Sequence, residues 1–150
     1  MRRAQILAAL LVFAAAPAYA QGGVDPWDTA SARAQARVEE FYALIDARQV
    51  GDAMAILDPA LLGTLADRLN WGRQFWSIRS IHVLDVEPWA TGEWTETRQR
   101  FKVTLEAYVE TQGNPAMPAY GWHDNPNIRW ITTTRDAAGS WRIAEIATGP

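Results

Sequence analysis

The pattern of apolar and polar residues is clearest at the C-terminal end of the chain. Two apolar runs, Ile128–Thr134 and Trp141–Ala147, flank Arg135–Ser140, in which Asp136 and Gly139 favour a turn. This pattern predicts a terminal β-hairpin with a loop of four to six residues. One face of such a hairpin is apolar, so another layer of the protein must cover it.

Two further strands are predicted before the hairpin. Trp94–Thr111 has the most regular alternation in the sequence, with Phe101 and Val103 among the apolar residues on one side and polar residues on the other. Trp76–Val86 alternates with one interruption, which predicts a β-bulge and a bent sheet. The segment Gln112–Asn127 is rich in proline and glycine and predicts a loop.

Helical periodicity dominates the N-terminal half. Ala30–Arg48 is predicted to be an amphipathic helix, because its apolar residues recur every three or four positions. A short helix over Ala53–Leu57 and a third over Pro59–Leu69 follow, and we expect the third to turn Leu65 and Leu69 toward the core. Helices followed by strands predict an α+β fold, with N-terminal helices packed on a curved four-stranded antiparallel sheet in meander order.

The first 20 residues predict a signal peptide. A basic start precedes the apolar run Ile6–Ala16, and Ala18-Tyr19-Ala20 forms a small-residue cleavage site before Gln21. The apolar run is shorter than the ~20 residues that a spanning helix needs, so the alternative of an uncleaved membrane anchor is weaker. We expect a signal peptide over 1–20, a flexible lead-in over 21–30 and a single domain over 31–150, exported to a periplasm or outside the cell with no membrane span after cleavage.

Composition narrows the classes of function. The chain has 14 basic and 17 acidic residues, a formal net charge of −3, and the predicted signal peptide contains two of the arginines. An acidic domain is a poor candidate for binding nucleic acid or an anionic membrane surface. Cysteine is absent, which excludes disulfides, thiolate metal sites and a lipid-modified cysteine. We expect no cofactor and no metal site, since neither histidine belongs to a metal-binding motif.

Three segments carry a resemblance to a known family. Phe41–Ile45 precedes the break Gly51-Asp52-Ala53, Leu57-Asp58-Pro59 opens the next helix, and Trp141–Ile146 leads into Thr148-Gly149-Pro150. Together they resemble the nuclear transport factor 2-like superfamily, in particular its exported, uncharacterised members. The resemblance implies a cone of helices in a strongly bent sheet, with a pocket between the helices and the concave sheet face.

What the resemblance implies about activity is broad. The superfamily includes ketosteroid isomerases, polyketide cyclases, dehydratases and many binding or docking domains, and relatives often dimerise through the outer sheet face. No catalytic pattern of the family matches this sequence residue by residue. A shared fold does not by itself specify a reaction.

Aromatic residues are the most prominent candidates for ligand contact. Eight tryptophans suit the walls of a concave apolar site, although large rings also fill the core and rim of a small domain without disulfides. Of these, Trp122 in a polar loop is the hardest to explain as core. The residues expected to line a pocket are Phe41, Trp76, Phe101, Trp122, Trp130 and Trp141.

Two residues are weak candidates for acid–base catalysis. His82 lies within an apolar strand, where a histidine is more often a hydrogen-bonded wall residue than a base. Glu145 interrupts the last strand: facing inward, its pKa would rise by desolvation, whereas a bulge would turn it to solvent. His123 and Asp124 are adjacent, and neighbours in an extended loop point apart rather than forming a dyad.

The sequence favours an exported, non-enzymatic ligand-binding or accessory domain with an apolar pocket for a small hydrophobic ligand. One alternative is a small-molecule isomerase, dehydratase or cyclase, which needs His82 or Glu145 inside the cone. Another is a docking or homodimerisation domain that uses the outer face of the sheet. A deep pocket with a titratable residue at its floor would favour the enzyme.

Overall fold

The structure is a computed structural model that describes residues 26–110, 122 and 125–150. The predicted signal peptide and nearly all of the predicted loop before residue 125 lie outside the described residues. In chain order the elements are α1 (Pro26–Asp46), α2 (Val50–Ile56), α3 (Pro59–Leu62), α4 (Leu65–Ser77), β1 (Ile78–Pro88), the 3-10 helix η1 (Thr91–Glu93), β2 (Arg98–Val109), β3 (Asn127–Arg135) and β4 (Trp141–Ala147).

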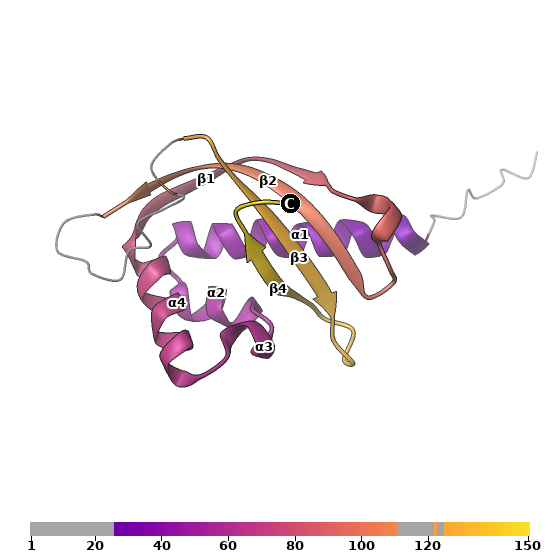
Figure 1. Ribbon diagram of the computed structural model, residues 1–150, viewed down its shortest axis with the longest axis horizontal. Coiled ribbons are helices and arrows are strands. Elements are labelled where there is room, and N and C mark those ends of the chain that lie inside the picture. Colours follow the sequence, from indigo (N-terminus) through magenta and orange to yellow (C-terminus); the bar gives the residue numbers. More distant parts are fainter. Residues whose placement is uncertain (1–25, 111–121, 123–124) are drawn as a thin grey trace, which may run out of the picture.

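The four strands form one antiparallel sheet in the order β1-β2-β3-β4. Figure 1 shows β1 and β2 arching over α1, while α2, α3 and α4 lie together below the C-terminal half of that helix. Both α2 and α3 also contact β4. The predicted α+β arrangement, with N-terminal helices packed on a curved sheet, is therefore confirmed.

Bulges bend the sheet and set which side chains face the helices. The β1–β2 register shifts twice, between Ile78 and Ser80 and between Val83 and Asp85, so the predicted bulge in this strand is present and a second accompanies it. In β4, Ile143 and Glu145 pair with consecutive residues of β3, which leaves one extra residue between them. This bulge buries Ile143 while Glu145 stays exposed.

The core forms between α1 and the inner face of β2. Phe101, Val103 and Leu105 are fully buried, as the alternation predicts, and Phe41 of α1 is buried with them. Phe75 from α4 meets Phe41 edge to face, with ring centroids 5.4 Å apart. The centre of the domain is therefore packed with apolar side chains.

The predicted third helix is two helices. Gly63 ends α3 with a φ of +56°, in the left-handed region that glycine adopts at little cost. Thr64 then caps α4: its Oγ1 accepts a hydrogen bond from the Asp67 N–H at 3.3 Å, and Asp67 Oδ2 accepts one from the Thr64 N–H at 2.8 Å. This capping box restarts the helix in a new phase.

The new helix continues to Ser77, past the point where the sequence pattern placed the change to a strand. Its new phase exposes Leu65 and Leu69, whose exposed fractions are 74% and 53%. The prediction that these two leucines face the core was wrong. Trp71 and Phe75 take the inward positions of α4 instead.

Candidate functional site

A cavity of about 460 Å³ lies between α4 and the ends of β3 and β4. Trp71 and Gln74 line it from α4, Arg129 from β3, and Trp122 from the segment before that strand. The fourth side is formed by 146–149 at the end of β4. A volume of this size falls within the range of about 300–1,000 Å³ that is typical of small-molecule sites.

The α4 wall is firmly held. Residues three apart share one face of a helix, so Trp71 and Gln74 point into the same space. Trp71 stacks on Phe75 with ring centroids 5.5 Å apart, and its Nε1 donates a hydrogen bond to the Leu61 carbonyl at 3.3 Å. Because Phe75 is buried in the core, the ring of Trp71 is a preorganised wall.

Arg129 contributes a buried positive charge. It occupies an inward position of β3 in the same alternation as Ile131, and it is 4% exposed. Its guanidinium lies over the ring of Trp122, 4.2 Å from the centroid, and its Nη1 donates a hydrogen bond to the Ile128 carbonyl at 2.7 Å. Burial lowers the pKa of Arg129 from its ordinary value, but an arginine side chain stays protonated at neutral pH.

Tyr42 lies near this arginine, deeper in the core. It is buried in α1, and its hydroxyl has no hydrogen-bond partner among the described residues. Burial raises the pKa of Tyr42, and the positive charge of Arg129 offsets this rise only in part. The phenol is therefore neutral at physiological pH. A hydroxyl in an apolar interior carries a desolvation cost that a hydrogen bond would relieve.

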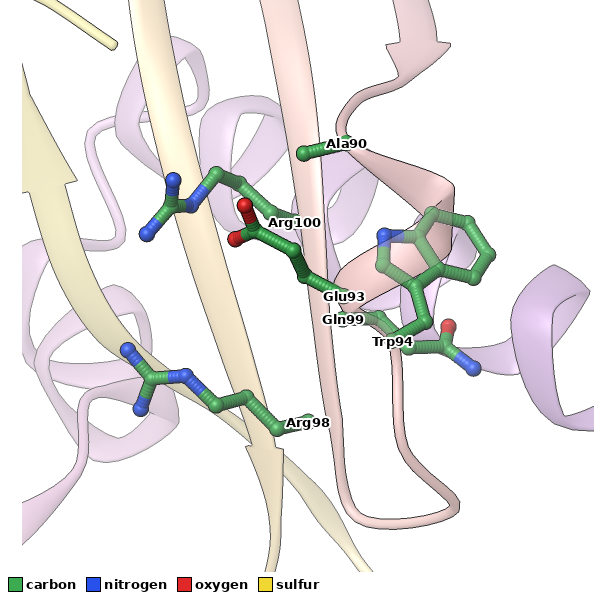
Figure 2. Close-up of a pocket in the computed structure, with 6 residues that line it drawn as sticks. All are labelled: Ala90, Glu93, Trp94, Arg98, Gln99 and Arg100. Carbon is green, nitrogen blue, oxygen red and sulfur yellow. The ribbon is translucent and has the colours of Figure 1, made fainter.

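Smaller hollows lie beside the sheet. One, of about 20 Å³, has room for a single water molecule. Figure 2 shows its lining: Arg98 and Arg100 project to one side of β2, whereas Gln99 extends to the other, toward a helix. A second hollow, of about 150 Å³, is lined by Trp130 and Glu145 among others. Both are smaller than typical ligand sites.

The six residues expected to line a pocket lie in several places. Phe41, Phe101 and Trp141 are buried in the core. Trp76 is 55% exposed. The guanidinium carbon of Arg48 lies over its ring, 4.7 Å from the ring centroid.

The other two lie on opposite faces of the sheet. Trp130 meets Trp89 edge to face, with ring centroids 6.1 Å apart, and lines the hollow that it shares with Glu145. Trp122 lines the 460 Å³ cavity. The structure thus brings Trp122 together with Trp71 and Arg129 rather than with the other five residues.

The two acid–base candidates lie on the surface. His82 is exposed on β1, opposite Glu106 of β2. Glu145 accepts a hydrogen bond from the Thr132 hydroxyl at 2.9 Å, and Arg98 Nη2 is 3.9 Å from its carboxylate. Neither is among the described residues that line the 460 Å³ cavity.

The described part of the chain holds neither a metal-binding cluster nor a membrane-spanning helix. Within residues 26–110, 122 and 125–150, no group of three or more histidine or carboxylate side chains is placed to hold a metal ion. In the same part of the chain, no helix is long and apolar enough to cross a membrane. His123 and Asp124 lie outside the described residues.

Sequence reasoning missed Arg129, Tyr42 and Trp71 as site residues. Arg129 could have been found, because a charged residue at an inward position of an alternating strand must be paired or functional. Trp71 was assigned to the segment after a helix, whereas it lies inside α4. Comparison of the chain with protein-family models, curated proteins and solved structures found no match.

Proposed function

We propose that this chain is an exported binding module that holds a small molecule in the cavity between α4 and the ends of β3 and β4. One observation carries the proposal: a ligand-sized space is walled by Trp71, Trp122 and Ile146 and has one buried cation, Arg129. Mostly apolar walls with a few placed polar groups are typical of small-molecule sites. The rings supply contact area for an apolar ligand.

The lining of the cavity favours binding over acid–base catalysis. Its described residues include no histidine and no carboxylate, and these are the commonest general acids and bases. Arginine does not deprotonate near neutral pH, so Arg129 is suited to hold charge rather than to transfer protons. The exposed positions of His82 and Glu145 agree with this choice.

Export and family membership belong to the same proposal. The basic start, apolar run and Ala18-Tyr19-Ala20 site support secretion. The order of helices and strands is compatible with the nuclear transport factor 2-like superfamily, and in that case the cavity would be its interior pocket. A binding role fits the many members of that family that are not enzymes.

The neutral dye N-phenylnaphthylamine tests the proposal, because its fluorescence rises in an apolar site. Trp122→Ala should weaken dye binding about tenfold, since one ring wall is lost. Trp76→Ala is a matched control: Trp76 also lies under an arginine, but it is not part of the cavity lining. Equal binding by both variants, or no binding by the wild type, would contradict the proposed function.

A further inference from the structure

We propose that the outer face of α4 binds an acidic amphipathic helix of another protein. This surface is separate from the cavity, and the inference does not depend on the proposed function. The described residues leave six large apolar side chains exposed, and three of these lie on α4: Leu65, Leu69 and Trp76, with exposed fractions of 74%, 53% and 55%. Single apolar residues are normal on a protein surface, whereas a contiguous group of them marks a site of interaction.

The three side chains lie along one line of the helix. Leu69 follows Leu65 by four residues and Trp76 follows it by eleven, which is close to one and three turns of about 3.6 residues each. The residues that α4 packs against the core, Trp71 and Phe75, leave the helix on another side. The packing of α4 on the domain therefore leaves this apolar line in solvent.

Gly72 opens a space in the middle of the line. It lies between Leu69 and Trp76, and a Cβ atom added to it would meet nothing within 4 Å. Residues at i, i+3, i+4 and i+7 form the hole that accepts one side chain of a facing helix. Two such sets share Gly72: Leu65, Arg68, Leu69 and Gly72 form one, and Leu69, Gly72, Arg73 and Trp76 form the next. This spacing fits two apolar side chains one turn apart on a partner helix.

The charges beside the line favour an acidic partner. Arg68 and Arg73 lie on its two sides, and both are exposed. Neither forms an ion pair with another described residue. Arg48 adds a third positive charge, because its guanidinium carbon lies 4.7 Å from the centroid of the Trp76 ring. Complementary charge on the partner would fix its orientation and speed its association.

The one acidic residue of α4 does not offset these arginines at the line. Asp67 is two residues from both Leu65 and Leu69, which places it about half a turn away, on the opposite side of the helix. Its carboxylate accepts hydrogen bonds from the N–H and the hydroxyl of Thr64. The outer face of α4 is therefore apolar and positively charged within a chain whose net charge is −3.

The same charges disfavour two other occupants. A second copy of the chain, packed face to face about a twofold axis, would place its own arginines against Arg68 and Arg73, and like charges repel. An anionic membrane would attract these arginines but would also meet the rest of an acidic chain. A single acidic helix contacts the arginines without meeting the rest of the surface.

Fluorescence anisotropy of two labelled peptides tests the inference. Each is a synthetic helix of about 20 residues with leucines along one face, flanked by glutamates in one peptide and by lysines in the other. The wild type should bind the acidic peptide at least about tenfold more tightly than the basic one. Leu69→Gln should weaken binding of the acidic peptide about tenfold. Leu84→Gln is the matched control, because Leu84 of β1 is 49% exposed and lies on a different element.

Gly72→Glu is a second variant that should keep the fold. Glutamate has a higher helix propensity than glycine, and its Cβ has room. It fills the space between the two holes and places an acid beside Arg68 and Arg73, so it should weaken binding of the acidic peptide at least about tenfold. Gly72→Glu and Leu69→Gln should bind N-phenylnaphthylamine as the wild type does, because neither residue lines the cavity.

The inference is wrong if the acidic peptide does not bind, if it binds no more tightly than the basic peptide, or if its binding survives both substitutions. Sedimentation that shows self-association, abolished by Leu69→Gln, would make the occupant a second copy and overturn the inference. Stronger binding to phosphatidylglycerol vesicles than to the acidic peptide would make it a membrane and overturn it as well. The proposed function is tested separately by the dye.

Discussion

Gln99 provides the sharpest test of the core. It occupies an inward position of β2, two residues before Phe101, and is 1% exposed. Neither Nε2 nor Oε1 of its amide has a hydrogen-bond partner among the described residues. A buried polar group left in this state costs about 1–3 kcal/mol, whereas an apolar group of similar shape at the same place removes that cost.

Methionine has a similar unbranched shape, and a volume-conserving core substitution usually costs less than about 1.5 kcal/mol. Gln99→Met removes two unsatisfied groups, so we expect it to raise the free energy of unfolding by about 1–3 kcal/mol. Urea unfolding followed by tryptophan fluorescence measures this change. For a domain of this size, it corresponds to a rise of several degrees in the melting temperature, on the order of 2–8 °C for each kcal/mol.

Gln49→Met is the matched control. Gln49 is exposed before α2, and its side chain makes no capping hydrogen bond, so the same chemical change should alter stability by less than about 0.5 kcal/mol. If Gln99→Met destabilises the protein, or changes its stability no more than the control does, the Gln99 amide is hydrogen-bonded inside the core and the reasoning is refuted.

Four other predictions concern the core, a helix cap, a charge and the processing of the chain. Phe101→Ala should lower the free energy of unfolding by about 3–5 kcal/mol in urea, and a loss below about 1 would contradict the buried position. Thr64→Ala should lower it by about 1 kcal/mol, and no loss would show that α4 does not begin at this cap.

The backbone N–H of Ser140 and the Arg142 guanidinium hold the pKa of Asp136 below its ordinary value of 3.8. The resulting stabilisation is present above that value and is lost as pH falls through the lower folded-state pKa, so Asp136→Asn should flatten the acid limb of a pH–stability profile. An unchanged limb would contradict this. N-terminal sequencing of the secreted protein should begin at Gln21, and an intact Met1 would contradict the predicted cleavage.

Local periodicity predicted the sheet well. A period of two residues is visible in the sequence alone. For this reason the strand Trp141–Ala147 was predicted with its observed bounds, and the core-facing positions of Phe101 and Val103 were predicted correctly. The split at Gly63 was missed, since it depends on a backbone angle. The Thr64-x-x-Asp67 pattern that restarts the helix was nevertheless readable in the sequence.

The site was less predictable than the sheet. Trp122 was singled out because a large ring in a polar loop needs an explanation, and it does line the cavity. Its partner Trp71 comes from α4, and the opposite wall comes from the end of β4. No local pattern shows that elements so distant in the chain enclose one space, whereas the packing of the helices on the sheet does.

A nitrogen–proton correlation spectrum of the tryptophan indoles tests the central claim most directly. The chain has eight tryptophans, each with one indole signal that single substitutions can assign. On titration with N-phenylnaphthylamine, the proposed function predicts saturable shifts for Trp71 and Trp122, which line the cavity, and none for Trp89 and Trp130, which pair elsewhere. Shifts at Trp89 and Trp130 with Trp71 and Trp122 unmoved, or no shift at any indole, would contradict it.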